Sequence, residues 1–180
     1  MKNNMILLLL LCSGIAGAQV KKVSLQASGL TCSMCSNAIN KALKSLDFVD
    51  HVDANIKNST FDISIKPDRE VDFDLIKKKV EDAGFFVADF YATIHFSDAK
   101  AVNDQHLVVS NHTYHFLNIK DQLLDGDKTI RFLDKGFVSA KEFKKNNAFT
   151  KMECYKTGMA AECCKKDGLA NGTRIFHVTI

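Results

Sequence analysis

Cys32 and Cys35, three positions apart, are the residues of this sequence best placed to do chemistry. Their sulfur atoms can turn toward one point if one cysteine lies in a loop and the other in the first turn of the helix that follows. The unpaired N–H groups of a helix N-terminus stabilise negative charge and so favour thiolates. Two thiolates suit a soft ion of low coordination number. Cu(I) fits best and Hg(II) also fits, whereas Zn(II) normally takes four ligands.

The same spacing also occurs in structural disulfides and in thioredoxin-like redox pairs. Redox catalysis is disfavoured because the sequence has no Trp, and because its single proline, Pro67, ends a predicted strand and does not face the cysteines. The antiparallel topology predicted below also differs from the parallel βαβ unit of the redox fold. The spacing by itself leaves metal binding, a disulfide and a redox pair open.

A second group of sulfur atoms lies in the segment 152–164. Soft ligands at this density suit Cu(I). The competing interpretation is a disulfide that closes a loop, joining Cys154 to Cys163 or Cys164. One such bond leaves one thiol, which could act as a third metal ligand or as a resolving thiol for Cys32 and Cys35. The sulfur residues of the segment are Met152, Cys154, Met159, Cys163 and Cys164.

Five histidines fall in the second half of the chain. In the run His112-x-x-His115 the two side chains point to opposite faces of a strand, which argues against a shared metal ion there. His115 and His177 could meet if their strands pair, but we expect single histidines on the polar faces of their strands. The five are His95, His106, His112, His115 and His177.

The first eighteen residues have the pattern of a signal peptide. Lys2 supplies a positive charge, Met5–Cys12 is an apolar run, and Ala16–Ala18 has the small-x-small pattern read by signal peptidase, so we expect cleavage before Gln19. Eight residues of helix span about 12 Å, well short of a bilayer core of about 30 Å, and no later apolar run is long enough to cross it. We therefore expect a periplasmic or secreted protein without a stable membrane span.

The elements that must position Cys32 and Cys35 are predicted from alternation and helical spacing. Apolar residues alternate in 23–27, 52–56 and 61–65, recur at helical spacing in 38–46 and 75–83, and form a last strand in 85–93. The order βαββαβ predicts an α+β fold, the ferredoxin-like sandwich of two helices on a four-stranded antiparallel sheet.

The second half, residues 95–180, predicts a small mostly-β module. We expect strands in 107–109, 113–119, 129–133, 137–139 and 174–180, and a short helix in 141–147. These strands could form a partly open barrel. We therefore divide the chain into residues 1–18, 19–94 and 95–180.

Composition excludes several classes of protein. Apolar residues make up 46% and charged residues 25% of the 180 residues, which is ordinary for a globular chain and excludes wholesale disorder. The formal net charge of +3 is too small to indicate nucleic-acid binding.

The run Gly29-Leu30-Thr31-Cys32-Ser33-Met34-Cys35, followed by a helix, a hairpin and Val80–Phe85, resembles the heavy-metal-associated domain family over about residues 20–93. The family includes metallochaperones, metal-binding modules of copper-transporting ATPases and periplasmic mercuric-ion-binding proteins. The resemblance implies that Cys32 and Cys35 are metal ligands. It also implies that Leu30 packs under the loop in place of the family's usual Met. Phe85 stands where ATPase modules often have an aromatic residue, and it could equally be part of the core.

We therefore expect an exported protein, not an enzyme, that carries or sequesters Cu(I) and exchanges it with a transport ATPase or another metal-binding exported protein. Binding of Hg(II) is the alternative within this class. A thiol-disulfide oxidoreductase working through Cys32 and Cys35 is the rival from another class. In a third hypothesis, residues 95–180 carry the main function and the first domain only delivers metal.

Overall fold

The computed structural model describes residues 19–30 and 33–180. The predicted signal peptide, residues 1–18, lies outside the described residues, as do Thr31 and Cys32. Within the described ranges, no helix is long and apolar enough to cross a membrane.

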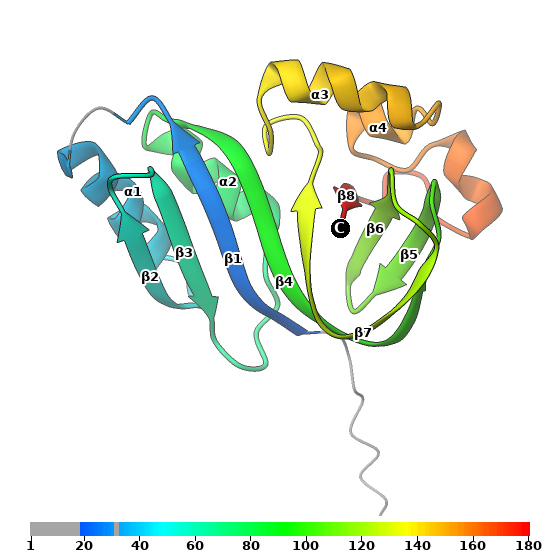
Figure 1. The fold of residues 1–180 in the computed structure, drawn as a ribbon, viewed down its shortest axis with the longest axis horizontal. Helices are drawn as coiled ribbons and strands as arrows, with labels where there is room; N and C mark the ends of the chain where they lie inside the picture. Colours follow the sequence, from blue (N-terminus) through cyan, green and yellow to red (C-terminus); the bar gives the residue numbers. More distant parts are fainter. Residues whose placement is uncertain (1–18, 31–32) are drawn as a thin grey trace, which may run out of the picture.

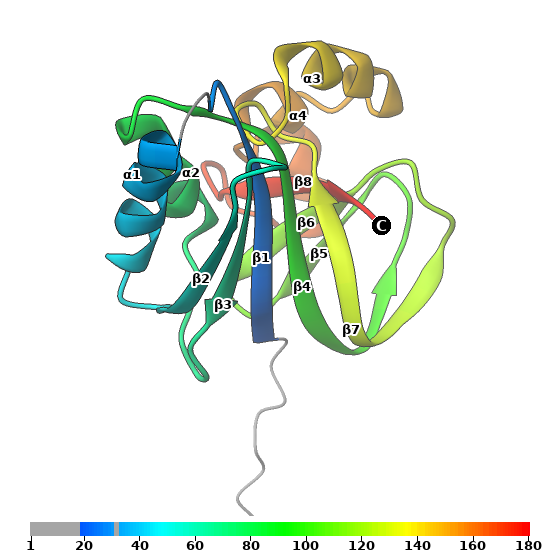
Figure 2. The same ribbon diagram turned by 60° about the vertical axis from the view of Figure 1, so that its left-hand side comes forward.

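The first half of the chain has the predicted βαββαβ order. Its strands pair antiparallel in the order β2-β3-β1-β4, which is the ferredoxin-like arrangement. Both helices cover the same face of this sheet (Figure 1), and they lie side by side when the molecule is turned (Figure 2). The prediction for this half is confirmed. The elements are β1 (Gln19–Ser28), α1 (Ser33–Lys44), β2 (Val49–Asn55), β3 (Thr60–Ile65), α2 (Phe73–Asp82) and β4 (Phe86–Ala101).

Helix α2 has a local structural feature at each end. The carboxylate of Asp72 accepts a hydrogen bond from the backbone N–H of Leu75 at 2.8 Å and so caps the first turn. Gly84 follows the last turn with φ of +89°, a left-handed conformation that favours glycine. Between these ends, Ile76 and Val80 are fully buried against the sheet.

The second half does not form a barrel of its own, which corrects the sequence-based expectation. Its strands extend the first sheet into one open sheet of eight strands, in the order β2-β3-β1-β4-β7-β8-β6-β5. The strand predicted in 137–139 does not form, because the chain turns there toward α3. The elements are β5 (Gln105–Val109), β6 (His112–Phe116), β7 (Gln122–Phe132), α3 (Ala140–Asn146), α4 (Cys154–Thr157), β8 (Ile175–Thr179) and the 3₁₀ helices η1 (Asn147–Phe149) and η2 (Glu162–Asp167).

Strand β4 belongs to both halves. It pairs with β1 as far as His95 and with β7 from Tyr91 to Ala101, so the predicted boundary at residue 94 falls inside a continuous strand. Its register with β7 shifts between Phe96 and Ala99, and such an irregularity bends a strand. Figure 1 shows β4 and β7 curving together into the second half.

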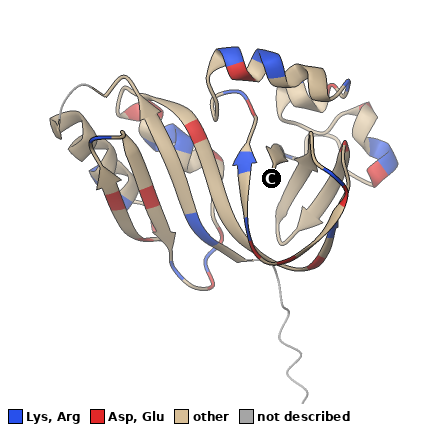
Figure 3. Cartoon of the chain, in the orientation of Figure 1, with Lys and Arg blue, Asp and Glu red and all other residues tan. Residues whose placement is uncertain are grey.

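Helix α2 packs against both halves through Phe73. The ring centroid of this fully buried side chain lies 6.1 Å from that of Phe90 on β4, 4.8 Å from Phe132 on β7 and 5.2 Å from Phe176 on β8. One hydrophobic core therefore underlies strands from the two halves. Acidic and basic residues are interspersed along the elements outside this core (Figure 3).

Candidate metal centres

Cys35 lies in the first turn of α1 and is partly buried. Helix α1 is held on the sheet by Ile39 and Leu43, which are fully buried, so the turn that carries Cys35 sits on a fixed element. The unpaired N–H groups of this turn stabilise an anionic sulfur or a bound anion. The geometry of Cys35 relative to Cys32 lies outside the described residues.

Two neighbours of the loop before α1 pack inward. The side chains of Leu30 and Phe85 are partly buried against the main core. Leu30 therefore packs against the core, and its position relative to Thr31 and Cys32 lies outside the described residues. Of the two roles left open for Phe85, packing against the core is the one that the structure shows.

Two other neighbours of the loop are exposed. Met34, in the first turn of α1, is 81% exposed, and Phe86, at the start of β4, is 70% exposed. Phe86 pairs with Ser28 at the end of β1, directly before the loop. Apolar side chains thus stand in solvent on α1, which follows the Cys-x-x-Cys loop, and on β4, which pairs with the strand before the loop.

The second group of thiols also comes together in space. The sulfur atoms of Cys154, Cys163 and Cys164 all lie within 4.8 Å of one another. Cys154 begins α4, and the other two lie in η2, with their sulfur atoms 3.5 Å apart. The three side chains are free thiols in the structure. The proximity that the sequence suggested is therefore present without the loop disulfide.

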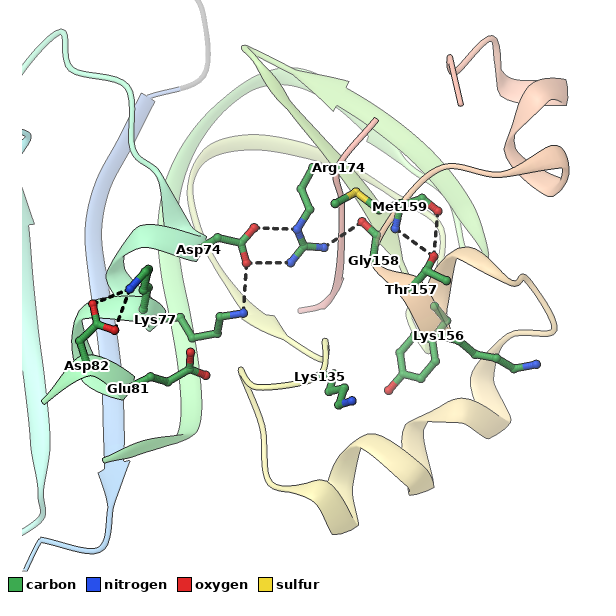
Figure 4. Close-up of a pocket in the computed structure, with 12 residues that line it drawn as sticks. Asp74, Lys77, Glu81, Asp82, Lys135, Lys156, Thr157, Gly158, Met159 and Arg174 are labelled. Atoms are coloured by element: carbon green, nitrogen blue, oxygen red, sulfur yellow. Dashed lines mark hydrogen bonds and ion pairs between the residues drawn. The ribbon is translucent and has the colours of Figure 1, made fainter. Parts of the chain in front are cut away.

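The two methionines of the 152–164 segment diverge. Met152 packs against the small apolar cluster that contains Cys154 and Cys164. Met159 is 44% exposed and lines a separate cleft of about 570 Å³, where it lies beside Arg174 (Figure 4). The structure therefore brings Met152 to the thiols and places Met159 in that cleft.

The three thiols differ in acidity. Burial raises the pKa of Cys154 and of Cys164 above the usual value for a thiol. Burial acts the same way on Cys163, but hydrogen bonds, the strongest of them involving the backbone of Cys154, outweigh it and lower the pKa of that thiol. Cys163, which is partly exposed, is thus the member of the group that forms a thiolate most readily.

Three histidines adjoin Cys154, and the expectation that they lie on polar faces is wrong. His115 and His177 are fully buried, and the side chain of His106 is 1% exposed. One face of their strands lies on the main core, and on the other face Cys154 of α4 and Asp167 of η2 contact the histidines. A signal was present in the sequence, since Leu117 and Ile175, which stand two positions from His115 and His177 and so share their faces, are apolar.

His112 behaves differently, as the spacing His112-x-x-His115 predicts. Its side chain lies on the opposite face of β6 from His115, where Nε2 is 2.9 Å from the carbonyl oxygen of Val71. Its ring also packs against that of Phe73, with centroids 4.9 Å apart. It therefore takes no part in the cluster around Cys154.

Comparison with known proteins found matches within the first half of the chain. Residues 24–86 match the family model of the heavy-metal-associated domain. The chain is 34% identical over 71 residues to a probable copper-exporting P-type ATPase of Archaeoglobus fulgidus, and 38% identical over 66 residues to a copper-transporting ATPase of Saccharomyces cerevisiae. These matches cover 39% and 37% of this chain but only 9% and 6% of the two relatives.

Solved structures match the same region. The CopZ metallochaperone is 28% identical to this chain, and the match covers 37% of this chain and 98% of CopZ with a TM-score of 0.35. The yeast copper transporter domain Ccc2a is 34% identical, with 37% of this chain and 90% of the domain covered and a TM-score of 0.34. The family match ends at residue 86 and leaves the second half of the chain without a family.

Proposed function

Proceeding from residues 24–86 as a heavy-metal-associated domain, we propose that this chain is an exported protein that carries or sequesters Cu(I) through the thiolates of Cys32 and Cys35. One observation carries the proposal: the family match spans both cysteines, and Cys35 occupies the first turn of a helix fixed on the sheet. The names of the relatives support copper as the ion, since both matched ATPases are described as transporting or exporting copper. Export is inferred from the signal-peptide pattern of residues 1–18.

The chemistry of such a carrier is ligand exchange. Two thiols release their protons to solvent as two sulfur–copper bonds form, and copper keeps its oxidation state. A thiolate of the acceptor protein can then add to the two-coordinate ion, and one original sulfur leaves as the new bond forms. Tight binding and fast transfer are compatible because a bond is made as another is broken. The partners would be a donor protein and an acceptor, such as a transport ATPase.

The exposed apolar side chains beside the loop suit this exchange. A partner that approaches the ion must also cover the surface around it, and Met34 and Phe86 offer apolar area there. Since Phe85 is packed into the core, it is Phe86 that presents an aromatic ring to a docking protein.

The first experiment counts Cu(I) ions bound by the full chain in competition with a chromophoric Cu(I) chelator. Replacing Cys32 and Cys35 together by Ser should remove one equivalent of tightly bound Cu(I), whereas Ser33→Ala, an exposed change in the same turn, should remove none. An unchanged number of equivalents in the double variant would overturn the assignment of these ligands. If the wild type instead reduces protein disulfides catalytically and Cys32→Ala stops the turnover, the oxidoreductase reading is correct.

The proposed export of the protein is tested by a separate measurement. When the full chain is produced in a Gram-negative host, we expect it in the periplasmic fraction, with a mature N-terminus at Gln19. Full-length chain retained in the cytoplasm would contradict export and leave the metal-binding test intact.

A further inference from the structure

Three neighbouring strands place one histidine each in a row on one face of the sheet. His106 on β5 stands opposite His115 on β6, and His115 stands beside His177 on β8, which runs parallel to β6. The ring centroids are 4.4 Å apart in the first pair and 5.0 Å apart in the second. The alternate residues of these strands, among them Tyr114 and Phe176, point to the opposite face and into the main core.

The thiol of Cys154 lies over this row. Its sulfur is 3.8 Å from Nε2 of His106, 3.8 Å from Nδ1 of His115 and 3.5 Å from Nε2 of His177. A tetrahedral ion with bonds of about 2.3 Å to sulfur and about 2.0 Å to nitrogen separates those two ligand atoms by about 3.5 Å. The observed separations thus have the size of the edges of a metal coordination shell.

Each of the three histidines is also oriented by a carboxylate at its other ring nitrogen. A carboxylate can only accept, so that nitrogen carries the proton and the nitrogen facing Cys154 keeps a lone pair. Carboxylate–histidine pairs of this kind are the usual outer shell of histidines that bind metal. The pairs are His106 Nδ1 with Asp167 at 2.5 Å, His115 Nε2 with Asp104 at 3.0 Å, and His177 Nδ1 with Asp134 at 2.9 Å.

We propose that His106, His115 and Cys154, whose ligand atoms all lie within 4.8 Å of one another, form the core of a second metal site for a thiophilic transition-metal ion, Cu(I) or Zn(II). Nε2 of His177 lies 3.5 Å from the same sulfur but does not belong to the group of ligand atoms that lie within 4.8 Å of one another. Binding replaces the proton of the Cys154 thiol, which passes to solvent, and neither ion changes its oxidation state. The site uses none of the residues of the Cys-x-x-Cys loop. This proposal can therefore be tested independently of the function proposed above.

The surroundings indicate a closed site that retains its ion. The core donors are buried, and α4 and η2 cover them. Catalytic metal sites keep an open position for water or substrate, whereas closed sites hold structure or store the ion. Cys163 and Cys164 lie against Cys154, and the partly exposed Cys163 stands where an ion from solvent would first meet sulfur.

The test uses the full chain with Cys32→Ser and Cys35→Ser, so that the first site is absent. We expect this background to bind one equivalent of Zn(II) or Cu(I) in competition with chromophoric chelators. Co(II) in place of Zn(II) should give the intense visible absorption of a tetrahedral ion with a thiolate ligand. Cys154→Ser should abolish that absorption. Asp167→Asn should weaken binding by about 10–100-fold, the usual effect of removing an outer-shell partner.

The matched control is Asp127→Asn. Its carboxylate bonds His95 at 2.6 Å in the same manner, but on the exposed surface of β4 and β7. This change should leave metal affinity unaltered.

Circular dichroism establishes that each variant is folded. If Cys154→Ser does not fold, the metal affinity of Asp167→Asn tests the proposal instead. The Asp167 side chain is partly exposed at the edge of the site, so this change should be tolerated by the fold. The proposal is overturned if the folded background binds neither ion. It is also overturned if binding persists and the folded variants at Cys154 and Asp167 leave the affinity unchanged.

Discussion

Cysteines in this chain differ in what their surroundings allow them to do. Cys35 sits at a helix N-terminus near solvent, where negative charge is stabilised and a partner thiol can approach. Cys154 is fully buried, and burial raises the pKa of its thiol, so it gives up its proton only to a strongly bound ion. The surroundings of Cys35 therefore favour exchange of a metal ion, and those of Cys154 favour its retention.

His112 makes the apo protein sensitive to acid. Burial lowers the pKa of this side chain, although its hydrogen bond to the Val71 carbonyl and the nearby Glu70 and Asp72 partly oppose the shift. An unfolded histidine has a pKa of about 6.5, so just below that pH the unfolded chain binds more protons than the folded one. His112 therefore contributes stability that is present above about pH 6.5 and is lost as the pH falls toward its folded pKa.

The measurement is urea unfolding of metal-free protein at several pH values from 7.5 to 5. The variant His112→Gln should lose stability less steeply on acidification than the wild type. His51→Gln, an exposed change, should keep the wild-type slope. Equal slopes for the wild type and His112→Gln would show that His112 does not contribute to the acid sensitivity.

At the scale of elements, α2 links the two halves in addition to the shared strand β4. Asp74 in its first turn accepts hydrogen bonds from Arg174 at 2.7 and 3.2 Å, across 100 residues of sequence (Figure 4). The Arg174 guanidinium also stacks over the ring of Phe176 at 4.2 Å. Burial alone would raise the pKa of Asp74, but Arg174 and Lys77 outweigh it and hold that pKa below its usual value.

A double-mutant cycle with Asp74→Asn and Arg174→Gln should give a coupling free energy of about 1 kcal/mol at pH 7, because the pair is bidentate but partly exposed. Since the folded pKa of Asp74 is depressed, the coupling is present above pH 4 and is lost as the pH falls through the folded pKa.

The comparison is the Lys78–Asp82 pair on the same helix, whose side chains are more than half exposed. Its cycle should give about 0.3–0.5 kcal/mol. A coupling for Asp74 and Arg174 no larger than this would mean that the ion pair is not what anchors α2 to the second half.

At the scale of the molecule, one sheet and one core join two candidate metal sites. Helix α1, which carries Cys35, and α4, which carries Cys154, lie on opposite sides of β4 in Figure 1. Between them, β4 is shared by both halves, and Phe73 packs on strands of both. The two halves should therefore fold and unfold together.

The variant Phe73→Ala tests whether the two halves unfold together. Removing a fully buried aromatic ring should lower the free energy of unfolding by about 3–5 kcal/mol. Hydrogen exchange followed by mass spectrometry should show the loss of protection in peptides of β3 and of β8 alike. Phe86→Ala, at an exposed ring, should change neither. A loss confined to one half would show that the halves are separate cooperative units.

What the sequence determined by itself is local. The alternation in three strand segments and the helical spacing in 38–46 and 75–83 depend on neighbours in the chain, and they suffice to predict the βαββαβ order. The sequence also marked the sulfur-rich segment 152–164, because its thiols are close in the chain.

Only the tertiary structure decided how distant segments pair. The alternation of apolar residues in β4 runs past residue 94 to Phe96, but no local pattern indicates that this stretch joins β7. Nor does any local pattern indicate that β8 runs parallel to β6 and sets His177 beside His115. Strand partners are selected by burial and packing of residues far apart in the sequence, and a one-residue change of register would turn each histidine to the other face. The cluster of histidines around Cys154 exists because that register was chosen by the shared core.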